Sequence, residues 1–208
     1  MTTVLAGAAA HNAGQYGVAR AVWAGGTPID PGSGDGDDNS DAAARLLDAL
    51  TAFATAVTES RRGDWEAART AATRASRAIE SVDGGDVDVE PIERWLAAFL
   101  ADPELAERSP PPSVPVAGDR PTPGELPLAA AAVVAGTIAE GRGEELDVVR
   151  DALRYARESE YPERTRYATF LRDYAAAESG SRAIVFERLS GLVARRRRKE
   201  DDVSELFD

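Results

Sequence analysis

Five polar residues in the first half of the chain are of types that could form a binding pocket. Arg20 follows a predicted helix–helix turn, while Asp48, Thr55, Thr58 and Glu59 fall in the next long predicted helix. If these side chains gather between facing helices, Arg20 could clamp a carboxylate or phosphate group through its planar guanidinium fork. The alternative is an ion pair at the rim of a hairpin, with a structural role. No catalytic triad, metal-ligand set or phosphate-binding loop accompanies the five residues, and we expect no cofactor or bound metal.

The single histidine, His11, lies beside the first predicted turn. A histidine without a partner acid in the sequence is typical of a capping or surface position.

One strongly basic run, at residues 195–199, ends the last predicted helix. Cations are favourable at the C-terminal end of a helix dipole, and Glu200 follows the run at once. These features favour a solvated or intramolecularly paired helix end, with RNA or DNA binding as the less favoured alternative. The arginines concerned are Arg195, Arg196, Arg197 and Arg198.

The composition is acidic and rich in alanine. The 208 residues carry a formal net charge of −12, 43% of them are hydrophobic, and Lys199 is the only lysine. Such a surface is typical of a protein from the salt-rich cytoplasm of a halophile, where a diffuse electrostatic attraction to nucleic acid would be weak. There is no cysteine, and no apolar run approaches the roughly 20 residues that a membrane-spanning helix needs. We expect a cytoplasmic protein without a membrane partner.

One local pattern occurs twice and predicts the architecture. Residues 14–20 and 63–69 share glycine, a polar residue, an aromatic residue, two further positions, alanine and arginine. The glycine can end one helix in the left-handed conformation, and the polar residue can cap the next helix. The aromatic residue would then wedge between the two helices. We therefore interpret Gly14 with Tyr16, and Gly63 with Trp65, as the elbows of two antiparallel helical hairpins.

Apolar residues at three- and four-residue spacing extend the helical pattern along the chain. Helices are predicted over 2–12, 15–24, about 41–61, 65–79, 92–100, 128–139 and 145–159, around 167–174, and from 184 into the basic run. The fold class is therefore all-α, a bundle of antiparallel hairpins with about seven to nine helices. Seven prolines break the pattern between 109 and 127. We divide the chain into a hairpin domain at 1–108, a Pro-rich linker at 109–127, and a C-terminal helical region at 128–208 packed on the first.

The elbows and their surroundings resemble the domain-of-unknown-function family 309, especially its haloarchaeal members. The likeness covers residues 12–23, 46–57, 62–68 and the tail 202–208. It implies a compact bundle of helical hairpins without an established activity. The family usually carries a histidine and an acid at the positions of Arg20 and Ala21, an acid at Ala24, and histidines at Thr58 and Glu59. If the family has an active centre there, this divergent chain has lost it.

These observations favour a non-catalytic module that binds a protein partner or a small ligand. A hydrolytic or metal-assisted enzyme is the first alternative, and it requires Arg20, Asp48 and Glu59 to converge. Nucleic-acid binding through the basic run is the second.

Overall fold

The computed structural model describes residues 1–26, 28–29, 40–82 and 84–204. This part of the chain forms ten α-helices and no β-strand, which confirms the all-helical prediction. None of the described helices is both long and apolar enough to cross a membrane. The acidic loop at 30–39 and the last residues of the tail lie outside the described residues.

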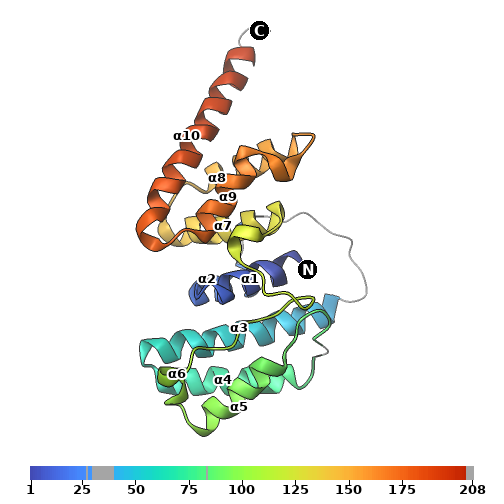
Figure 1. The fold of residues 1–208 in the computed structure, drawn as a ribbon, viewed down its shortest axis with the longest axis vertical. Coiled ribbons are helices and arrows are strands. Elements are labelled where there is room, and N and C mark those ends of the chain that lie inside the picture. The colour runs from blue at the N-terminus through green and yellow to red at the C-terminus, as the bar shows by residue number, and fades with distance from the viewer. Residues whose placement is uncertain (27, 30–39, 83, 205–208) are drawn as a thin grey trace.

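A short hairpin lies at the centre of the molecule (Figure 1). It consists of α1 (Thr2–Asn12) and α2 (Tyr16–Trp23). The two helices approach closely because Gly7 lacks a side chain: a Cβ atom there would lie 2.2 Å from the Trp23 indole nitrogen. That nitrogen donates a hydrogen bond to the Val4 carbonyl at 3.3 Å.

Both predicted elbows form as the sequence suggests. Gly14 and Gly63 have φ angles of 75° and 79°, in the left-handed region that glycine tolerates best. At each elbow the residue after the glycine donates its backbone N–H to a carbonyl five residues earlier, which is the Schellman pattern. Asp64 also caps the following helix by accepting from the Ala67 N–H at 3.0 Å.

The first core lies between the central hairpin and the helices of residues 40–108 (Figure 1). These helices are α3 (Ser40–Arg62), α4 (Trp65–Ile79), α5 (Glu90–Ala101) and α6 (Leu105–Arg108). Trp23 and Trp95 are buried in this core, whereas the elbow rings of Tyr16 and Trp65 are half-buried against it. The two wedges therefore contact the core without being enclosed by it.

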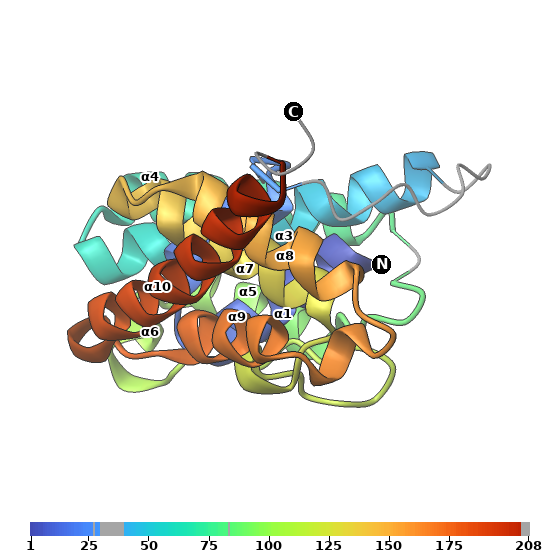
Figure 2. The same cartoon turned by 90° about the horizontal axis from the view of Figure 1, so that it is seen from above.

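A second core lies on the other side of the hairpin. It is built by η1 (Pro123–Glu125), α7 (Leu128–Arg142), α8 (Leu146–Arg157), η2 (Pro162–Arg164), α9 (Arg166–Ala176) and α10 (Ser179–Ser204). Helix α7 contacts both α1 and α2. Helix α10 runs obliquely past α8 and α9 (Figure 2), and its C-terminal part extends beyond them (Figure 1).

The central helix α1 contributes to both cores, because its side chains are apolar on every side. Val4 and Ala8 belong to the first core, while Ala6 and Ala9 belong to the second. A helix that is apolar all round requires cover on more than one face. The hairpin α1–α2 is therefore the layer that joins the two halves of the chain.

The Pro-rich segment at 109–127 is a strap across the hairpin. Val114, Val116 and Leu126 are buried, and the Asn12 side chain is hydrogen-bonded to the backbone of Val114 and to the carbonyl of Pro121. An isolated antiparallel bridge joins Val87 to Val116. The strap therefore contributes buried side chains to the hydrophobic cores.

Candidate functional site

Only part of the predicted polar pocket comes together. The Arg20 guanidinium lies 3.5 Å from the Glu59 carboxylate, and Arg62 reaches the same carboxylate at 3.0 Å. This is the rim ion pair that the sequence offered as the structural alternative. Arg20 is partly exposed, whereas Glu59 is largely covered.

The remaining three residues of that prediction do not join this ion pair. Asp48 is exposed and pairs with Arg74 of α4, three turns of helix, about 16 Å, from Glu59. Thr55 donates its hydroxyl to the Thr51 carbonyl, and Thr58 donates to the Ala54 carbonyl, so both hydroxyls are bonded within α3. Thr55 and Thr58 lie within about one turn of Glu59, but they line two different hollows of the surface. The prediction that all five converge is therefore wrong, because Asp48 lies three turns away and the two hydroxyls are bonded to their own helix.

The prediction for His11 is also wrong, since its imidazole is 2% exposed. The ring packs among Tyr16, Phe53 and Trp23 at centroid distances of 4.9, 5.0 and 6.0 Å. Its Nε2–H donates to the Pro112 carbonyl of the strap at 2.9 Å. Burial lowers the pKa of His11 to about 4, against the smaller raising effect of that hydrogen bond. His11 is thus a neutral core residue that fastens the strap.

Two arginines of the basic run, Arg196 and Arg197, are paired with residues of α8 and its C-terminal end. Arg197 pairs with Asp151, and Arg196 pairs with Glu158 and Glu200 and lies over the Tyr155 ring. Arg198 donates to the Ala194 carbonyl, while Arg195 is exposed without a described ion pair. Pairing within the molecule neutralises Arg196 and Arg197, which reduces the positive charge that this run could offer to a nucleic acid.

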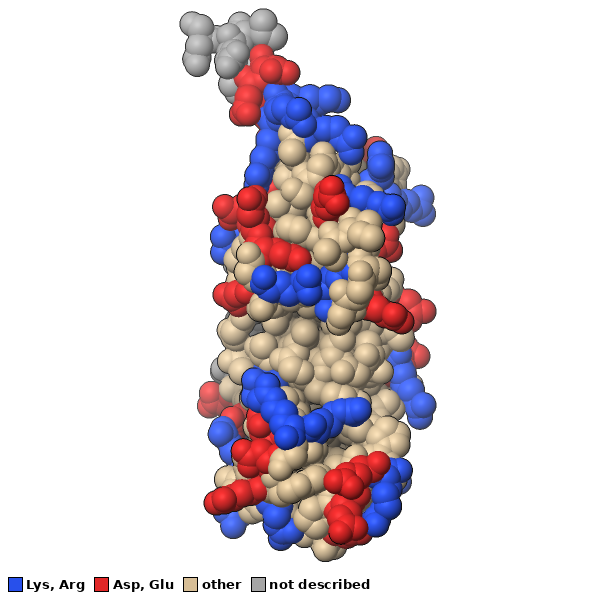
Figure 3. Space-filling view, turned by 90° about the vertical axis from the view of Figure 1, so that its left-hand side faces the viewer, with Lys and Arg blue, Asp and Glu red and all other residues tan. Residues whose placement is uncertain are grey.

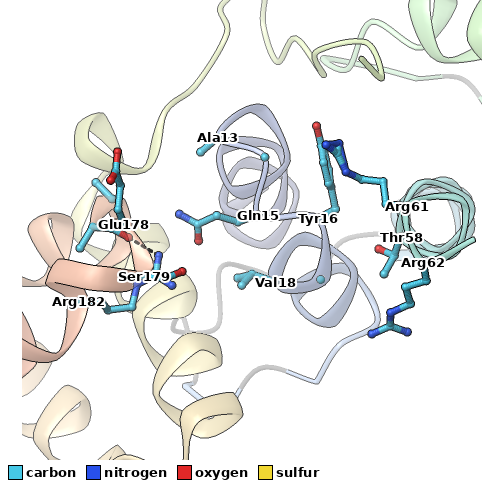
Figure 4. Close-up of a pocket in the computed structure, with 14 residues that line it drawn as sticks. Ala13, Gln15, Tyr16, Val18, Thr58, Arg61, Arg62, Glu178, Ser179 and Arg182 are labelled. Carbon is cyan, nitrogen blue, oxygen red and sulfur yellow. Dashed lines mark hydrogen bonds between the residues drawn. The ribbon is translucent and has the colours of Figure 1, made fainter. Parts of the chain in front are cut away.

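A groove lies at the tip of the first elbow, where three distant segments meet (Figure 4). We call it the elbow groove, and its volume is about 640 Å³. Its floor is the turn at 13–18, one wall is the end of α3, and the other is the α9–α10 turn at 176–182. The polar and charged side chains that line it are Gln15, Tyr16, Thr58, Arg61, Arg62, Glu178, Ser179 and Arg182.

No known protein family, curated protein or solved structure matches this chain. The resemblance to family 309 accordingly stays a prediction that rests on the elbow motifs. The chemistry of the elbow groove has to be inferred from the groove itself.

Two residues that line the elbow groove each have a buried polar atom without a hydrogen-bond partner among the described residues: Gln15 Oε1 and Arg182 Nε. Gln15 reaches from the elbow toward the α9–α10 turn (Figure 4), where its Nε2 donates to the Ala175 carbonyl at 3.0 Å. Arg182 is 9% exposed and donates through Nη2 to the Ala177 carbonyl. Burial lowers the pKa of Arg182, because a charge is disfavoured away from water.

The wall formed by α3 is basic. The Arg61 guanidinium lies 5.2 Å from the centroid of the Tyr16 ring, and Arg62 forms an ion pair with Glu59. Figure 3 views the molecule from the side on which the elbow lies and shows an uncharged band with basic side chains above and below it. Glu178 is the one carboxylate among the residues that line the groove.

Sequence reasoning missed Arg61, Arg182 and the role of Gln15. Gln15 had a local explanation as a cap, although its side chain does not cap α2. Arg182 looked like any other arginine in a chain rich in them. The described residues include no group of three or more histidine, aspartate or glutamate side chains that could hold a metal ion.

Proposed function

We propose that the protein is a non-catalytic small-ligand-binding module and that the elbow groove is its binding site. The observation that carries the proposal is a groove in which two buried polar atoms, Gln15 Oε1 and Arg182 Nε, lack protein partners. Its volume of about 640 Å³ falls within the range of roughly 300–1,000 Å³ typical of small-molecule pockets. Of the two occupants expected from the sequence, this size favours a small ligand over a protein partner.

The basic groups of the groove support binding over catalysis, and its one carboxylate, Glu178, has no histidine or second acid beside it in the lining. Arginine keeps its proton near neutral pH, so Arg61, Arg62 and Arg182 can hold an acceptor but cannot exchange protons with a substrate. The enzyme alternative depended on Arg20, Asp48 and Glu59 acting together, and the separation of Asp48 from the other two argues against it.

A ligand screen with a groove-filling variant tests the proposal. Gly17 lies in the groove and Gly191 lies on α10, and a Cβ atom at either position would meet nothing within 4 Å. Gly17→Phe should therefore fill the groove, whereas Gly191→Phe should leave it open. Thermal unfolding is measured with a panel of neutral, cationic and anionic small molecules.

At least one compound should raise the unfolding temperature of the wild type and of Gly191→Phe, with no shift for Gly17→Phe. A panel without any shift, or a shift that persists in Gly17→Phe, would contradict the proposal.

The composition supports a proposal about the solution in which the protein works. The net charge of −12 and the single lysine favour a protein that works in a salt-rich cytoplasm. Membership of family 309 is likewise proposed, on the strength of the two elbows.

A further inference from the structure

We propose that the ligand of the elbow groove is a small oxyanion that carries its own hydroxyl donor, and that buried Arg182 is its anchor. Inorganic phosphate, which keeps an O–H near neutral pH, and hydroxy acids belong to this class. The inference rests on the proposed function and adds the chemistry that the groove would select.

Arg182 provides the first step of the argument. Its guanidinium is almost wholly buried, its Nε has no described partner, and it forms no ion pair with a described residue. Glu144 acts on Arg182 electrostatically but forms no ion pair with it. A buried charge without a directly paired counter-charge is costly, and an unpaired donor adds to that cost. An oxyanion bound at Nε would remove both costs at once.

The backbone around Arg182 favours negative charge as well. Helix α2 begins at Tyr16 without a side-chain cap, and the Gln15 amide donates to the Ala175 carbonyl. Its first N–H groups, at residues 16–18, belong to the groove lining, and α10 begins at Ser179 on the opposite wall. N-terminal helix ends carry partial positive charge and free N–H groups, the arrangement that binds phosphates and carboxylates.

The basic α3 wall makes the groove a local exception in an acidic protein. Arg61 forms no ion pair with a described residue, and Arg62 is only partly neutralised by Glu59. The chain as a whole has a charge of −12 and repels anions elsewhere. Arg61 lies across the elbow from Arg182 (Figure 4), so we expect it to raise the local potential rather than to hold the ligand.

Gln15 narrows the class of ligand. Donation from its Nε2 to the Ala175 carbonyl fixes the amide, which leaves Oε1 as a buried acceptor without a described partner. A ligand that reaches this acceptor can satisfy it only through an O–H or N–H group of its own. Phosphate keeps an O–H near neutral pH, whereas sulfate has the same shape and no donor.

Arginine side-chain NMR on the full chain tests the inference. The Nε–H signals are followed while inorganic phosphate or sulfate is added at constant ionic strength, and the Arg182 signal is assigned by its loss in Arg182→Gln. Phosphate should shift the Arg182 signal saturably, with an affinity roughly tenfold higher than that of sulfate, because only phosphate satisfies Gln15. An unmoved Arg182 signal, or sulfate binding as tightly as phosphate, would overturn the inference.

Two further variants separate specific binding from general charge. Arg61→Gln should weaken phosphate binding about two- to fivefold, as expected for an exposed charge. Arg69→Gln removes an exposed arginine of α4 that lies outside the groove, and it should leave the affinity unchanged. Equal weakening by both would overturn the inference.

The outcome also distinguishes this inference from the proposed function. If only neutral or cationic compounds bind, and Gly17→Phe blocks them, the binding module stands and the oxyanion class is wrong.

Discussion

At the residue scale, His11 makes the stability of the fold depend on pH. Its pKa is about 4 in the folded chain and 6.5 when unfolded, so the unfolded chain binds the extra proton between these values. The free energy of unfolding should therefore fall as the pH drops below 6.5, by about 2 kcal/mol between pH 7 and pH 5. Urea unfolding at a series of pH values measures this.

His11→Gln provides the control, since no other histidine titrates in this range. The variant should be less stable but nearly independent of pH between 7 and 5. If its free energy of unfolding fell with decreasing pH as steeply as that of the wild type, His11 would not be the group responsible for the pH dependence.

The elbow glycines, Gly14 and Gly63, also contribute to stability as single residues. Gly14→Ala and Gly63→Ala each force a side chain into the left-handed region, although no neighbour obstructs the added Cβ atom. Each should lower the free energy of unfolding by about 1–2 kcal/mol. Gly141→Ala, in ordinary helical geometry near the end of α7, should instead raise it by up to about 1 kcal/mol. Chemical denaturation measures the free energy of unfolding of the three variants. Equal changes in all three would contradict the role assigned to the elbow glycines.

The elbows were predictable at this scale, whereas the groove was not. A Schellman turn depends on a glycine and its immediate neighbours, which the sequence displays directly. The contact from Gln15 to Ala175 joins residues 160 positions apart, and no local pattern encodes it. His11 was misjudged because its burial comes from the strap and from Phe53 of α3.

At the scale of elements, apolar residues at three- and four-residue spacing predicted most of the helices. The same spacing did not predict how the helices are arranged in layers. The amphipathic stripes of α4 and α8 correctly indicated which faces are buried. In α1 and α7, by contrast, alanine and valine cover almost every face, so no single stripe exists. This pattern is itself the sign of a helix enclosed on several sides, which identifies the centre of the molecule.

The last turns of α10 are held to α8 by Arg197. Its pair with Asp151 is partly covered, and Arg197→Ala should cost roughly 0.5–1 kcal/mol of unfolding free energy. Arg195→Ala removes an exposed arginine of the same run and should change it by less than about 0.5 kcal/mol. Thermal unfolding at low salt compares the two, and equal losses would mean that the α8–α10 pairing contributes nothing.

At the scale of the whole molecule, the acidic composition predicts a response to salt. The net charge of −12 opposes the compact state through self-repulsion, and salt screens that repulsion. Salt also weakens the surface ion pairs, but each of those contributes little. The free energy of unfolding should therefore rise between about 0.1 and 1 M KCl, where the Debye length falls from roughly 10 Å to 3 Å. Urea unfolding at a series of KCl concentrations measures this. A steady decrease in the free energy of unfolding with salt would show that attraction within the surface ion pairs outweighs the self-repulsion.

The proposed binding site depends on the first elbow meeting the end of α9 and the turn that follows it, because that contact builds the groove. Proton–proton Overhauser spectroscopy of the labelled protein tests this most directly, through the side-chain amide of Gln15. We predict cross-peaks from the Gln15 amide protons to Ala175, as the hydrogen bond of 3.0 Å requires. A Gln15 amide that exchanges freely with water and shows no cross-peak to residues 175–182 would contradict the groove and the binding site proposed in it.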